Sequence, residues 1–168
     1  MVHPRACLTG QRLHNPRPAG SVPPVTGTQS RGWGSLRDDL EADLRRVTDR
    51  LRNLSAARLA AAPTPPDGGW PLYGTSAQAG RAAAGELAAT ALALEAAADG
   101  VAYERRDLPE LSDFAVADQV AVTGHDLLAA LERVLPGARV WTSTYVETTA
   151  ADAVAFAARV LADVRRRI

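Results

Sequence analysis

The chain has 168 residues, 46% of them hydrophobic, which suits one domain with an extension. Its 19 basic residues balance 19 acidic ones, so the formal net charge is zero. A single cysteine, Cys7, excludes an internal disulfide framework and any cysteine-based zinc site. No stretch reaches the about 18–20 apolar residues of a membrane span, and no signal peptide is evident at the N-terminus. Together with the lone thiol, this predicts a cytoplasmic protein that does not enter a membrane.

The residue usage is unusual. The chain contains 34 alanines but no lysine, and Ile168 is its only isoleucine. Alanine, arginine, glycine and proline have GC-rich codons, so we infer a high-GC bacterial genome. This inference concerns mutational bias and says nothing about mechanism.

Residues 1–34 are predicted to form a disordered, basic tail, because they are rich in proline and glycine and show no apolar periodicity. Residues 1–37 carry a charge of +5 and no acid, whereas residues 38–168 carry −5. Three explanations of this basic, acid-free segment stay open: an inert tail, a misassigned start codon, or a basic arm that contacts nucleic acid. Because the arginines are scattered, nucleic-acid binding is the least favoured. The helical domain is predicted over residues 35–168.

A first helix is predicted over residues 35–62, where Ser35 and Asp38 have the capping-box pattern. Pro63 cannot continue it. Large apolar residues recur three or four positions apart along this stretch, as one helical face requires. They are Leu40, Leu44, Val47, Leu51 and Leu54.

A second helix is predicted over residues 75–100. Thr75 and Gln78 form another capping pair, and Gly100 is a natural stop. Alanine supplies 12 of its 26 residues, which favours the helix but buries little area per side chain. The larger leucines must therefore supply most of the hydrophobic contact: Leu87, Leu92 and Leu94.

A third helix is predicted over residues 111–134, with Ser112 as its cap and a possible break at Thr123. One face is apolar: Ala117, Val120, Gly124, Leu127, Leu128, Leu131 and Leu135. The polar residues Asp118, Gln119, His125 and Glu132 mostly fall on the opposite side.

A fourth helix is predicted over residues 149–168, capped by Thr149 with Asp152. Its apolar face consists of Val154, Ala157, Leu161, Val164 and Ile168. The preceding link, residues 138–148, is rich in β-forming residues and is either a short strand or a loop.

Four amphipathic segments predict an all-α fold, specifically a four-helix bundle. The connections are longer than those of a minimal bundle. They carry large aromatic residues that we expect to fold over the helices and close the ends of the bundle: Trp70, Tyr73, Tyr103, Trp141 and Tyr145.

The polar cluster of the third helix is the first candidate for chemistry. His125 and Asp126 are sequence neighbours, so on a helix they point about 100° apart and cannot act as a pair. A solvated helix face is therefore the preferred interpretation. His125 is the only imidazole of the predicted domain, and the chain contains no Glu-x-x-His motif, so we predict no metal site and no cofactor. Nucleophile-elbow, Walker and dinucleotide-binding motifs are also missing.

The preferred functional hypothesis is a non-catalytic helical protein that acts by self-association, as a homodimer, or by binding a protein partner. The alternative is a small-molecule binding protein or enzyme with a pocket in the helical bundle near Trp70, Tyr73 and His125. The candidate binding residues, for a partner or a ligand, are Trp70, Tyr73, Asp118, His125 and Tyr145.

Overall fold

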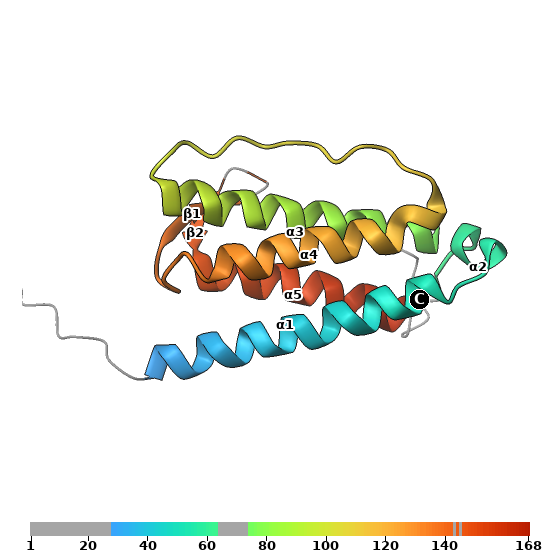
Figure 1. Ribbon diagram of the computed structural model, residues 1–168, viewed down its shortest axis with the longest axis horizontal. Helices are drawn as coiled ribbons and strands as arrows, with labels where there is room; N and C mark the ends of the chain where they lie inside the picture. The colour runs from blue at the N-terminus through green and yellow to red at the C-terminus, as the bar shows by residue number, and fades with distance from the viewer. Residues whose placement is uncertain (1–27, 64–73, 143, 145) are drawn as a thin grey trace, which may run out of the picture.

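The computed structural model describes residues 28–63, 74–142, 144 and 146–168 (Figure 1). This part of the chain is mostly helical, as predicted. Its α-helices are α1 (Thr28–Arg52), α2 (Ala56–Ala60), α3 (Ser76–Asp99), α4 (Val116–Leu131) and α5 (Ala150–Arg167). A 3₁₀ turn, η1 (Asp113–Ala115), precedes α4, and strands β1 (Arg139–Trp141) and β2 (Glu147–Thr149) pair antiparallel. The prediction of an all-α fold is therefore corrected. A two-stranded sheet is also present, because the link before α5 forms a β-hairpin.

Helix α1 differs from its prediction at both ends. It begins at Thr28, so residues 28–34, predicted as tail, are helical. Trp33 and Leu36 extend the apolar face and pack against the core, which explains the earlier start. Ser35 is not a cap, because its hydroxyl donates to the Gly32 carbonyl inside the helix. Residues 1–27, with the rest of the predicted tail, lie outside the described residues.

The predicted first helix also ends early, at Arg52. The Asn53 side chain donates to the Asp49 carbonyl, and Ser55 then caps the short helix α2 by accepting from the Arg58 amide. These local side-chain bonds give the backbone an alternative to a continuous helix, which is why the single predicted segment divides.

Helix α3 matches its prediction. The Thr75 hydroxyl accepts from the Gln78 amide at 3.1 Å, and Gly100 ends the helix in the left-handed region with φ 66°. The amide of Gly100 bonds the Ala96 carbonyl, as a left-handed helix end requires. Leu87 and Leu94 are buried, as predicted for the large residues of an alanine-rich helix, whereas Leu92 is only partly buried.

Helix α4 is continuous, and the possible break at Thr123 does not occur. The Thr123 hydroxyl bonds back to the Gln119 carbonyl at 2.9 Å instead of capping a new start. Ser112 precedes η1 but makes no side-chain capping bond. Leu135, predicted on the buried face, lies beyond the end of the helix and is 77% exposed.

Helix α5 matches its prediction. Thr149 accepts from the Asp152 amide and donates to its carboxylate, and the whole predicted apolar face is buried. The hairpin before it pairs Val140 with Thr148. Val140 is 1% exposed, so one face of the hairpin packs on the helices and the other faces outward.

Helices α1 and α3 each pack against both α4 and α5 (Figure 1). α3 and α4 run in the same direction, and the segment 100–112 returns alongside α3 to connect them. The ion pairs agree with these directions. Arg133 near the end of α4 pairs with Asp99 at the end of α3, while Arg37 near the start of α1 pairs with Glu132.

Small residues let these helices approach closely. A methyl group at Gly80 of α3 would lie 2.7 Å from a methyl of Val116 in α4. At Gly124 of α4 it would overlap the Leu44 side chain of α1. The alanine and glycine content is thus a packing requirement at particular positions, and the leucines fill the space between the backbones.

Candidate functional site

The predicted polar residues of α4 lie at its surface. His125 is exposed, and Asp118 accepts a hydrogen bond from Arg52 of α1 at 2.9 Å. Neither residue lines any of the hollows described below. Trp70, Tyr73 and Tyr145, the other predicted site residues, lie outside the described residues. Of the five candidates, the structure therefore places two, and it does not bring these two into a pocket.

Within the described part of the chain, no three His, Cys, Asp or Glu side chains gather as metal ligands. The perturbed carboxylates lie in ion pairs with arginine. The hydrogen bond from Arg139 lowers the pKa of Glu147, and the hydrogen bond from Arg167 lowers the pKa of Asp163. Both changes favour the charged form and are typical of structural ion pairs.

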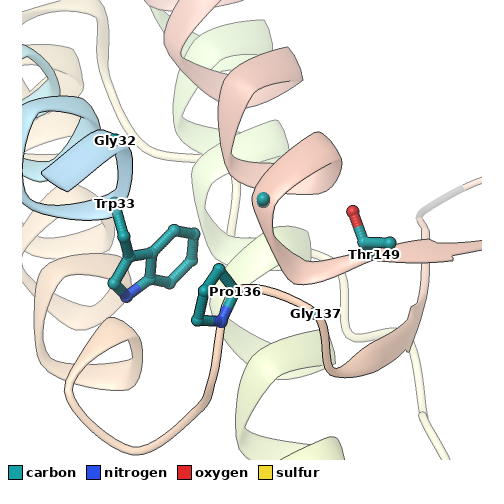
Figure 2. Close-up of a pocket in the computed structure, with 6 residues that line it drawn as sticks. Gly32, Trp33, Pro136, Gly137 and Thr149 are labelled. Carbon is teal, nitrogen blue, oxygen red and sulfur yellow. The ribbon is translucent and has the colours of Figure 1, made fainter. Parts of the chain in front are cut away.

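One hollow, of about 210 Å³, lies where the start of α1 meets the end of β2. Figure 2 shows the Trp33 indole beside the ring of Pro136, with Thr149 across the hollow. Trp33 is half-buried and also contacts the core. The hollow is thus held open by a rigid aromatic ring and a rigid proline.

The outward face of the hairpin adjoins this hollow through Thr149. Residues two apart, and directly opposed residues, share a face of a β-ribbon, so Arg139, Trp141, Glu147 and Thr149 lie together. Trp141 is 48% exposed, which corrects the expectation that it closes the end of the helices. We call these residues and those beside the hollow the end surface: Trp33, Pro136, Arg139, Trp141, Glu147 and Thr149.

A second hollow, the hairpin hollow, lies on the opposite side of the ribbon. Its volume is about 440 Å³. Hairpin residues Thr142 and Val146 form one wall and α5 residues Phe156 and Arg159 form another. Val146 is 59% and Phe156 48% exposed, so this hollow has an apolar lining open to solvent.

The segment 100–112 covers two hollows along α3 that are smaller than the hairpin hollow, with volumes of about 270 and 220 Å³. Gln119 of α4 holds this segment by donating to the Pro109 carbonyl at 2.8 Å. Gln119 is only 8% exposed, although it was predicted on the polar side of its helix. The long connection covers it, and a helical pattern by itself cannot show such a cover.

Comparisons with protein-family models, with curated proteins and with solved structures found no match. Among the described residues, no helix combines the length and apolar character needed to cross a membrane.

The sequence interpretation did not single out Trp33, Phe156 or Val146. Phe156 stands on a helix whose apolar face it does not share, and such an outlying aromatic residue is a usable signal. Val146 gave no such signal, because its exposure depends on the hairpin turn.

Proposed function

We propose that this protein is non-catalytic and acts by self-association through the end surface. The supporting observation is Trp141, a large aromatic side chain left 48% exposed on the outward face of the hairpin. Tryptophan is enriched among residues that dominate binding energy, because it buries a large area at little entropic cost. The rigid hollow beside Trp33 and Pro136 offers a complementary feature on the same surface.

The charges of the end surface favour a second copy of the chain as the partner. Arg139 and Glu147 lie side by side on it, joined at 2.8 Å, so the surface carries both signs. In a two-fold arrangement the same patch meets itself, and Arg139 of one copy can then pair with Glu147 of the other, with the reciprocal pair formed as well. A surface of mixed charge is compatible with itself, whereas a surface of one sign would repel its copy.

Sedimentation equilibrium over a concentration series tests the proposal. We expect a monomer–dimer equilibrium, and Trp141→Ala should weaken it about tenfold or more. Phe114→Ala is the matched control, because Phe114 is 72% exposed on η1, away from the hairpin. A monomer at every concentration up to about 1 mM contradicts the proposal, as does equal dimerisation of both variants.

We also propose that the four long helices constitute a four-helix bundle, to which α2 and the hairpin are additions. Each of them packs on two others around a shared apolar core, which supports this. A cytoplasmic location in a high-GC bacterium remains part of the proposal. The support comes from the lone thiol and the codon bias of the sequence.

Small-molecule binding is the second candidate function. The observation that favours it is the hairpin hollow, whose volume of about 440 Å³ falls in the range of ligand pockets. It differs from the pocket predicted near His125, which lies on the exposed face of α4.

A further inference from the structure

The hairpin hollow has an apolar floor. Val146 from the hairpin, with Ala153 and Phe156 from α5, supply it. Val146 and Phe156 each leave about half of their surface exposed. Covering such surface contributes roughly 25 cal/mol per Å², so an occupant with an apolar body is favoured.

One cation is held at this floor. The Arg159 guanidinium carbon lies over the Phe156 ring, 5.7 Å from its centroid. Among the described residues Arg159 has no ion-pair partner, whereas Arg165, Arg166 and Arg167 of the same helix all pair with acids. A guanidinium placed over an aromatic ring keeps its N–H edge available, and that edge matches a carboxylate with two parallel hydrogen bonds.

Two carboxylates line the same hollow, Glu86 from α3 and Asp152 from α5. Each already accepts a hydrogen bond, from the Thr90 hydroxyl at 3.5 Å and from the Thr149 hydroxyl at 2.7 Å. A carboxylate has about four acceptor positions, so Asp152 retains capacity for an ammonium group. With two acids and one arginine, the lining also disfavours a multiply charged anion such as a nucleotide.

We propose that the hairpin hollow binds a free α-amino acid with an apolar side chain. The carboxylate of this ligand pairs with Arg159, its ammonium group meets Asp152, and its side chain covers Phe156 and Val146. An apolar floor flanked by one cation and two anions matches a zwitterion with an apolar body. The inference is independent of the proposed self-association, because the two sites use opposite faces of the hairpin.

Isothermal titration of the full chain with L-phenylalanine and L-leucine tests the proposal. We expect saturable binding of at least one of them. The analogues 3-phenylpropionate, which lacks the ammonium group, and phenethylamine, which lacks the carboxylate, should each bind about tenfold more weakly. No binding of either amino acid, or equal binding of the analogues, overturns the proposal.

Variants locate the ligand in the hollow. Arg159→Gln should weaken L-phenylalanine about tenfold and leave phenethylamine unchanged, because only the amino acid carries the carboxylate. Arg58→Gln is the matched control, since Arg58 is exposed on α2 and has no ion-pair partner among the described residues.

Phe156→Ala should weaken the binding of L-phenylalanine, whereas Phe114→Ala should not. Circular dichroism verifies that each variant is folded, and unchanged binding by folded Arg159→Gln and Phe156→Ala protein overturns the site.

Discussion

Asp163 is the acid whose ion pairs are best protected from solvent in the described structure. Its side chain is 21% exposed, and Arg167, which donates to it at 2.7 Å, is 11% exposed. Arg166 adds a second hydrogen bond at 3.1 Å. Most other ion pairs here join exposed side chains, where the contribution to stability is about 0–1 kcal/mol. Asp163 is therefore the residue at which pH should act most clearly on folding.

The hydrogen bond from Arg167 lowers the pKa of Asp163 below its ordinary value of 3.8. A depressed folded-state pKa stabilises the protein above the unfolded value, and this stabilisation disappears as pH falls through the folded value. We expect Asp163→Asn to cost up to about 1 kcal/mol at pH 7 and progressively less below about pH 4. Urea unfolding at several pH values measures the difference. Asp126→Asn is the control, because Asp126 is exposed on α4 and has no ion-pair partner among the described residues. A difference that stays constant with pH contradicts the argument.

The helices differ in how far their local sequence determines where they begin. Helices α3 and α5 begin at threonine caps whose bonds span three residues, so they follow from local sequence. Helix α1 extends further than its local signals indicate, because Trp33 and Leu36 gain contacts with the core. The glycines of the helices also differ in whether tertiary packing requires them. Gly85 and Gly124 provide a matched comparison. An added methyl at Gly85 meets nothing within 4 Å, while at Gly124 it overlaps Leu44.

Alanine substitution separates helix propensity from packing at these two positions. We expect Gly85→Ala to stabilise the protein by about 0.5–1 kcal/mol, because alanine is the better helix former and space is free. Gly124→Ala should destabilise it by about 1–3 kcal/mol, since the added methyl overlaps Leu44, which is 2% exposed and packed in the core. Chemical denaturation of both variants provides the comparison. Stabilisation by both substitutions would show that α1 and α4 are not packed this closely.

At the scale of the whole molecule, the parallel course of α3 and α4 requires a connection that returns along their length. The segment 100–112 provides it without helix or strand, and Tyr103 and Leu108 are its half-buried contacts with the core. Gln119 fixes the segment from α4 through the Pro109 carbonyl, and Arg81 fixes it from α3 through the Leu111 carbonyl at 3.0 Å. Because the connection forms no helix or strand, no regular ladder of backbone hydrogen bonds protects it from local opening.

Hydrogen exchange should report that opening. We expect the amides of residues 102–112 to exchange faster than those of α3, and Gln119→Leu to accelerate them about fivefold, as the loss of roughly 1 kcal/mol implies. Helix α3 should keep its protection. His125→Leu, on the exposed face of the same helix, is the control and should leave the connection unchanged. Equal protection of residues 102–112 and α3 would contradict this account.

The candidate site shows the limit of sequence reasoning. The interpretation of His125 and Asp118 as a solvated face agrees with their exposure, because helical periodicity is local and separates the two sides of a helix. The hairpin hollow was not foreseen, since it combines Glu86, Val146 and Arg159 from separate elements. Their proximity depends on how the hairpin folds back over α3 and α5.

The sequence by itself determined the helical character, the caps of α3 and α5 and the apolar faces, because hydrogen bonds and side-chain periodicity within a helix involve residues only three or four positions apart. Only the tertiary structure decided the start of α1, the pairing of the hairpin, the burial of Gln119 and the two hollows beside the hairpin. Each of these depends on surface buried between segments far apart in the chain. Such contacts set which helix ends and loops are stable, and local sequence does not specify which segments will meet.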